Sequence, residues 1–123
     1  MSSDEERYAE HRLDLAREVV SVVLNDLHRT TDRRPNVELD LVLGAIRIQV
    51  DGNFTTPSMF AVDHAAALAE VASYMQEQLS ENAWMWPVCE THDVGLHAEV
   101  HNAKAVWWCN LGQHERARIG ELQ

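Results

Sequence analysis

The residues best suited to chemistry are concentrated between positions 84 and 114 of the chain. This stretch holds both cysteines, all four tryptophans and four of the seven histidines: Cys89, Cys109, Trp84, Trp86, Trp107, Trp108, His92, His97, His101 and His114. Thiolate sulfur and imidazole nitrogen are the ligands that zinc prefers in proteins. The clustering therefore predicts a metal site in the C-terminal third of the chain.

The spacing within this stretch suggests a set of ligands. Two residues separate Cys89 from His92, so both side chains of one tight turn can reach the same cation. Cys109 and His114 can complete a Cys2His2 site, although four residues lie between them and His97 competes for the fourth position. Four protein ligands would make a closed structural zinc site.

The segments around these residues have the pattern of a zinc ribbon. Residues 96–100 and 105–108 are expected to be strands joined by a turn near 102–104, and residues 117–119 could add a third strand. Such a hairpin would return Cys109 to the turn that carries Cys89. Trp86, Trp107 and Trp108 would supply the apolar cover that so small a unit lacks.

A catalytic metal site is the alternative interpretation. In a strand, His97, Glu99 and His101 would point to the same side and could hold a metal with open positions. Their order does not match the His-Glu-x-x-His helix of zincin proteases or the zinc motif of nucleobase deaminases. The chain also lacks a glycine-rich phosphate loop and a Gly-x-Ser-x-Gly elbow. The sequence therefore predicts no catalytic residue and favours a binding protein over an enzyme.

A third interpretation involves no metal. Cys89 and Cys109 would then be buried thiols or occasional redox partners, and the histidines would be surface residues. A structural disulfide is disfavoured, because the acidic residues 1–6 do not resemble a secretory signal and predict a cytoplasmic protein.

The rest of the chain supplies the elements that must support this unit. Apolar residues recur at helical spacing over residues 4–29, and Pro35 breaks the pattern. Alternating apolar residues predict strands over 37–43 and 46–50, and Asp63 is a candidate N-cap for a second helix over 63–79. Residues 51–58 are expected to close the second strand and form a loop.

The predicted hairpin has a defined register. A two-residue turn at Gly44 and Ala45 would place Leu43 opposite Ile46, Leu41 opposite Ile48 and Leu39 opposite Val50. All large apolar side chains would then share one face, against which the second helix can pack.

Length and composition fit a small compact protein. The chain has 123 residues, 46% of them hydrophobic, and its longest apolar run, at 41–46, is far below the ~18 residues that a membrane span needs. We expect an α+β fold: a helix, β-hairpin, helix core over residues 1–82, and a zinc-ribbon-like β unit over residues 83–123 packed on it.

Charge bears on the choice of partners. The net charge is -10, and no Lys or Arg occurs between Arg47 and Lys104, which disfavours the phosphate contacts of nucleic-acid binding. This acidic stretch is expected to be a solvated surface or a docking surface for a basic partner.

The C-terminal third also resembles a known group of proteins. The residues Trp86-Pro87-x-Cys89-x-x-His92, Gly95-Leu96-His97, Ala105-Val106-Trp107-Trp108-Cys109, His114 and Ile119-Gly120-x-Leu122 resemble small bacterial proteins of unassigned function that end in a zinc-ribbon-like segment. The resemblance covers residues 84–122. It implies a metal-binding tail and implies no activity.

These observations together favour a binding or regulatory module with a structural zinc ion. The expected partner is a protein, not nucleic acid or membrane, and it would contact either the acidic surface or an exposed aromatic residue such as Trp84. The long N-terminal helix is compatible with a homodimer.

Overall fold

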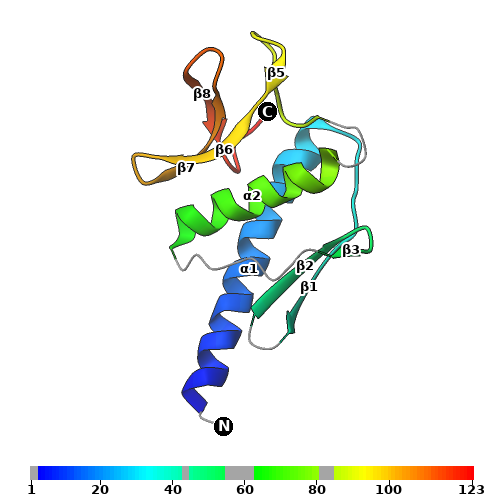
Figure 1. Ribbon diagram of the computed structural model, residues 1–123, viewed down its shortest axis with the longest axis vertical. Helices are drawn as coiled ribbons and strands as arrows, with labels where there is room; N and C mark the ends of the chain where they lie inside the picture. Colours follow the sequence, from blue (N-terminus) through cyan, green and yellow to red (C-terminus); the bar gives the residue numbers. More distant parts are fainter. Residues whose placement is uncertain (1–2, 43–44, 55–62, 81–84) are drawn as a thin grey trace.

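The computed structural model describes residues 3–42, 45–54, 63–80 and 85–123 (Figure 1). Along the described chain the elements are α1 (Ser3–Thr30), β1 (Val37–Val42), β2 (Ala45–Val50), β3 (Asn53–Phe54), α2 (His64–Ser80), β4 (Val88–Cys89), β5 (Val94–Gly95), β6 (His97–His101), β7 (Lys104–Cys109) and β8 (His114–Arg118). This α+β order of helix, hairpin, helix and C-terminal strands confirms the predicted fold class.

Helix α1 is about 42 Å long for its 28 residues. Its buried side chains recur every three or four positions, at Ala16, Val19, Val23 and Leu27. At the end of the helix, side-chain hydroxyls donate to carbonyls of the last turn: Thr30 Oγ1 to that of Asp26 over 2.8 Å and Thr31 Oγ1 to that of Leu27 over 2.9 Å.

The first sheet has the order β1-β2-β3 and is antiparallel. Its register differs from the predicted one, because Leu41 lies opposite Ile46 and Leu39 opposite Ile48. Ala45 pairs with Val42 and so belongs to the strand; of the predicted turn, Gly44 lies outside the described residues. The shift of two residues leaves the apolar side chains on one face, since side chains in a strand alternate with period two.

The second strand is followed by a further short strand where a loop was expected. Asp51 and Gly52 both have positive φ, of 51° and 84°, which is the conformation of a two-residue type I′ hairpin turn. The chain therefore returns at once, and β3 pairs with the end of β2.

Helix α2 begins at the predicted cap. The Asp63 carboxylate accepts a hydrogen bond from the backbone N–H of Ala66 over 3.1 Å, the contact expected of an N-cap residue. One side of the helix is rich in buried apolar residues, among them Leu68, Val71 and Met75.

The C-terminal strands form two small antiparallel sheets, β4-β5 and β6-β7-β8. Strands β6 and β7 match the predicted hairpin, with Asn102 and Ala103 at positive φ in its turn. The third strand begins earlier than predicted, at His114 instead of Ala117.

The helix pair lies between the two larger sheets in the view of Figure 1, with the hairpin on one side and β6-β7-β8 on the other. Buried residues of α1, α2, β2 and β7 belong to one hydrophobic cluster, which includes Leu27, Ile48, Met75 and Trp107. The N-terminal part and the C-terminal strands are therefore joined by a continuous core. No helix in the described part of the chain has the length and apolar character to cross a membrane.

Candidate metal centre

Two hairpin turns of the same size carry the cysteines and histidines. In the first, Cys89 pairs with Val94 across β4 and β5; in the second, Cys109 pairs with His114 across β7 and β8. In both, the fourth and last residue of the turn has a φ of 53°: Asp93 and Gln113. Each cysteine is thus the last strand residue before a four-residue turn of similar shape.

The two turns place their ligands differently. In the first turn the histidine, His92, stands three residues after its cysteine, whereas the corresponding position of the second turn is Gly112. His114 stands two residues further along and is the first residue of the returning strand β8. This geometry explains how a pair with four intervening residues can reach the same point as a pair with two.

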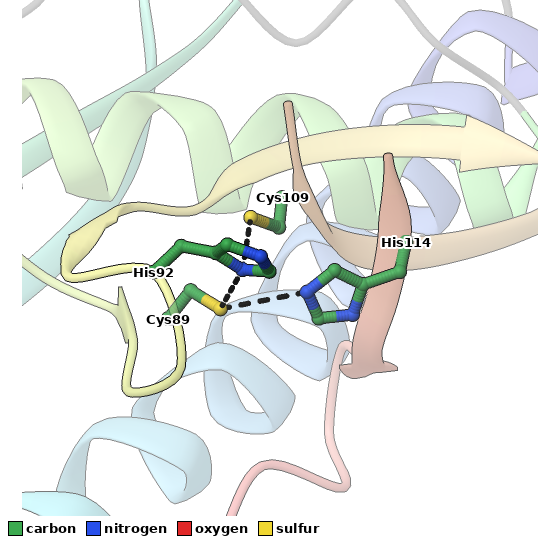
Figure 2. Close-up of side chains that lie close together, drawn as sticks. All are labelled: Cys89, His92, Cys109 and His114. Atoms are coloured by element: carbon green, nitrogen blue, oxygen red, sulfur yellow. Dashed lines mark hydrogen bonds between the residues drawn. The ribbon is translucent and has the colours of Figure 1, made fainter. Parts of the chain in front are cut away.

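The four ligand atoms converge. Cys89 Sγ lies 3.4 Å from His92 Nδ1 and 3.5 Å from His114 Nε2, and Cys109 Sγ lies 3.5 Å from His92 Nδ1 (Figure 2). All four atoms lie within 4.8 Å of one another, and they form the one such group in the described part of the chain. The group can bind a metal ion.

Gly112 is required for this convergence. A Cβ atom at this position would lie 2.3 Å from His92 Cε1 and 2.6 Å from His114 Cδ2, closer than packed carbon atoms approach. The backbone of Gly112 also donates a hydrogen bond to Cys109 Sγ over 3.3 Å. The glycine therefore makes room for both imidazole rings and orients one sulfur.

Hydrogen bonding favours a thiolate in this cluster, although burial opposes it. Both cysteines are fully buried and free, while His92 and His114 are half-buried. Hydrogen bonding to His92, and more weakly to His114 and Cys109, lowers the pKa of Cys89 from 9.0 to about 6, against the opposing effect of desolvation. A thiolate at neutral pH is the form that binds metal ions.

Two tryptophans fasten this unit to helix α1. Trp107 donates from Nε1 to Asp26 over 2.8 Å, and Trp86 donates from Nε1 to Thr30 Oγ1 over 3.0 Å. Their rings meet edge to face with centroids 5.3 Å apart. Both are buried, as predicted, whereas Trp108 is half-buried and stacks on His101.

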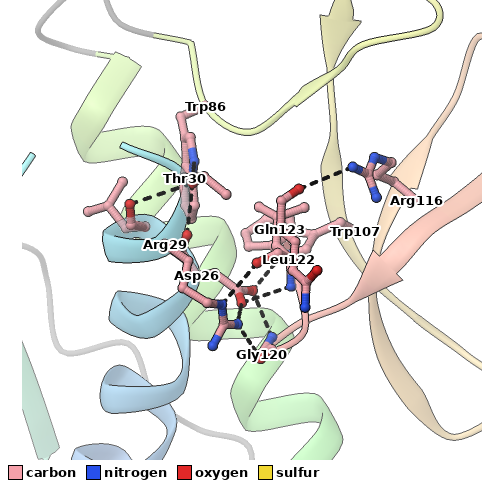
Figure 3. A network of polar contacts seen from close by, with 10 residues as sticks. Asp26, Arg29, Thr30, Trp86, Trp107, Arg116, Gly120, Leu122 and Gln123 are labelled. Atoms are coloured by element: carbon pink, nitrogen blue, oxygen red, sulfur yellow. Dashed lines mark hydrogen bonds and ion pairs between the residues drawn. The ribbon is translucent and has the colours of Figure 1, made fainter. Parts of the chain in front are cut away.

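Asp26 is the centre of a polar network that joins helix α1 to the C-terminal residues (Figure 3). Its fully buried carboxylate accepts hydrogen bonds from Trp107, from the backbone N–H of Gly120 over 2.7 Å and from that of Leu122 over 3.0 Å, and it pairs with Arg29. Arg29 in turn donates to the carbonyls of Gly120 and Leu122. The network anchors residues 120–122 to α1.

The structure separates the remaining candidate ligands from the cluster. His97 is exposed and lies opposite Trp108 on the neighbouring strand, so strand alternation directs it away from the face of Cys109. His114, not His97, is the fourth member of the group. Glu99 and His101 bind each other over 2.8 Å and do not converge with His97 on one point. Trp84 lies outside the described residues.

The sequence pattern did not lead us to two residues that the structure shows to be important, Asp26 and Gly112. Asp26 is an acid within the apolar stripe of α1, one turn after Val23 and beside Leu27, and a charge at such a position indicates a buried partner. Gly112 stands three residues after Cys109, the separation at which His92 follows Cys89, and comparison of the two turns would have identified it.

Comparisons with known proteins add no further constraint on this site. The chain matches no protein-family model, no curated protein and no solved structure. The chemistry of the site is therefore inferred from its own residues.

Proposed function

We propose that Cys89, His92, Cys109 and His114 hold one zinc ion in a closed structural site, and that the protein is a binding or regulatory module. The observation that carries this proposal is the spacing of the ligand atoms. Zinc bonds of about 2.3 Å to sulfur and about 2.05 Å to nitrogen give a tetrahedral sulfur–nitrogen edge of about 3.6 Å. The three sulfur–nitrogen distances of 3.4, 3.5 and 3.5 Å are close to it.

The donor set and its surroundings support zinc over other metals. Two sulfur and two nitrogen ligands in a tetrahedral arrangement are typical of zinc. His114 directs Nε2 to the cluster while its Nδ1 lies 3.4 Å from the Glu115 carbonyl, the outer contact that usually fixes the orientation of a zinc-bound histidine. Bound zinc would be redox-inactive and would tie the two hairpin turns together.

A catalytic site is less well supported. Four converging protein ligands leave no position for water, whereas catalytic zinc keeps one. The alternative ligands on β6 have other contacts. Glu99 and His101 form a hydrogen bond with each other, and the His101 ring stacks on that of Trp108 with centroids 4.1 Å apart.

The expected partner is a protein. A net charge of -10 disfavours nucleic acid, and Leu111, in the second ligand-bearing turn, is 66% exposed and so accessible to a partner. Affinity capture with wild-type and Leu111→Glu protein tests this point. A protein enriched only by the wild type supports the proposal, and nucleic acid as the captured species contradicts it.

A cytoplasmic location belongs to the same proposal. Both cysteines are free, and metal-bound thiolates are more typical of a reducing compartment than of a secreted protein.

Elemental analysis of untagged protein, with thiol titration in parallel, tests the zinc site. We expect about one zinc per chain, with both cysteines protected until a chelator is added. Cys89→Ser should lose the metal and lower the melting temperature, because metal binding and folding of this unit are coupled. His97→Ala is the matched control and should retain the metal. Metal-free protein with two reactive thiols would refute the site.

A further inference from the structure

A pocket of about 610 Å³ lies between the C-terminal half of α2 and the segment from Met85 to His97. This volume is in the range of small-molecule sites. Buried Trp86 and Leu96 contribute apolar lining, and Met85 lies over Gly95, whose missing side chain leaves room for the Met85 sulfur. The zinc proposal assigns no role to this pocket.

Gln76 gives the pocket a defined shape. Its side-chain amide donates to the carbonyl of Trp86 over 3.2 Å and to that of Leu96 over 2.5 Å. The two hydrogens of the amide are thereby committed, and they join two segments of the wall to α2. The amide oxygen accepts no hydrogen bond from any described residue, so it remains as an acceptor on a lining residue.

The pocket lining contains one carboxylate, that of Glu77, and no lysine or arginine. Glu77 follows Gln76 on the same helix, is exposed, and forms no ion pair within the described ranges. All lining residues fall in the part of the sequence between Arg47 and Lys104 that contains no Lys or Arg. The pocket therefore offers a carboxylate and an amide oxygen beside apolar residues, and its lining contains no Lys or Arg; among the lining residues, His97 alone can carry a positive charge, when it is protonated.

We propose that this pocket binds a small organic cation, an amine or amidine carried on a compact apolar body. The cationic group would donate to Glu77 and Gln76, because charge-assisted hydrogen bonds are stronger than neutral ones. The apolar body would lie against Trp86 and Leu96. The absence of Lys and Arg between Arg47 and Lys104 would then help the pocket to select a cationic ligand, in addition to giving an acidic surface.

Titration of isotope-labelled protein with benzylamine, followed by NMR, tests the proposal against benzyl alcohol as a neutral ligand of matched shape. We expect benzylamine to shift the amide signals of Glu77, Gly95 and Leu96 and to bind about tenfold more tightly than the alcohol. Glu77→Gln should remove that preference. Glu38→Gln, on strand β1, is the matched control with the same loss of charge, and it should keep the preference.

A second variant distinguishes binding in the pocket from attraction of the amine by surface charge alone. Ser73→Trp places a large ring in the pocket from an exposed position of α2, so it should abolish binding of both ligands without loss of folding. Equal affinities for benzylamine and benzyl alcohol, or an unaffected Ser73→Trp variant, would overturn the proposal. Binding of a lysine-rich peptide without binding of benzylamine would also overturn it, in favour of a protein partner. Zinc content, measured on the same samples, separates failure of this proposal from failure of the metal site.

Discussion

Replacement of Gly112 by alanine should prevent metal binding while leaving the hydrophobic core intact. The added Cβ would lie 2.3 Å from His92 Cε1 and 2.6 Å from His114 Cδ2. To restore an ordinary carbon contact, the His92 ring must retreat by about 1 Å. Metal–ligand distances tolerate about 0.2 Å, so the rings cannot hold the ion and avoid the methyl group together.

The expected loss of zinc affinity is at least ~100-fold, comparable to the larger effects of disturbing the groups that orient a ligand. Backbone strain does not contribute, because Gly112 is not among the glycines with positive φ. Without metal the rings are free to turn aside, so the free energy of unfolding of the metal-free variant should stay within ~1 kcal/mol of the metal-free wild type.

Competition with a chromogenic chelator measures the affinity, and urea unfolding with and without chelator measures the stability. Gly52→Ala is the control: its φ of 84° makes alanine unfavourable, but nothing lies within 4 Å of the new methyl group. It should lose about 1 kcal/mol of stability and no metal affinity. Wild-type affinity in Gly112→Ala would show that the two rings do not lie against residue 112, and the arrangement of the site would be wrong.

Three further predictions concern other parts of the molecule, each measured by urea unfolding. In metal-free protein the lowered pKa of Cys89, about 6, adds stability that is complete above pH 9 and lost as the pH falls towards 6; stability should rise over this interval, and a flat profile would contradict the shift. Asp26→Asn should cost about 3 kcal/mol, because the amide cannot accept from every donor around it and the pair with Arg29 is lost; a loss below ~1 kcal/mol would argue against the network. Ala103→Gly should add about 0.5–1 kcal/mol by relieving a φ of 64° in the β6–β7 turn, and destabilisation would show that this turn is described wrongly.

Periodicity predicted the helices and the faces of the strands well, and the turns less well. Helix α1 follows the repeat of Val19, Val23 and Leu27, and α2 begins at the Asp63 cap. The register of the first hairpin was wrong by two residues. A shift of the register by two residues keeps the same side chains on the buried face. The alternating pattern therefore cannot decide which two residues form the turn, because that choice depends on local backbone geometry.

The candidate site was predictable in part for a related reason. Cys89 and His92 share one turn, so their separation along the sequence reflects their separation in space. Cys109 and His114 converge only because a strand pairing puts them opposite each other, and His97 was excluded only by its position opposite Trp108. Both pairings depend on the residues at which each hairpin turn begins and ends, which the spacing of the ligands does not specify. The burial of Asp26 depends on contacts with residues far away in the sequence.

The Asp26 network also sets an order of events in folding. Its contacts with Gly120 and Leu122 span 94 and 96 residues, and closing a loop of that length costs about 4 kcal/mol of chain entropy. Helix α1 can form locally, yet its buried carboxylate has no backbone partners until residues 120–122 have been synthesised and have docked. We therefore expect docking of the C-terminal strands, and not helix formation, to limit the folding rate. During translation the Asp26 carboxylate would therefore have only Arg29 as a partner until Trp107 and residues 120–122 have been synthesised.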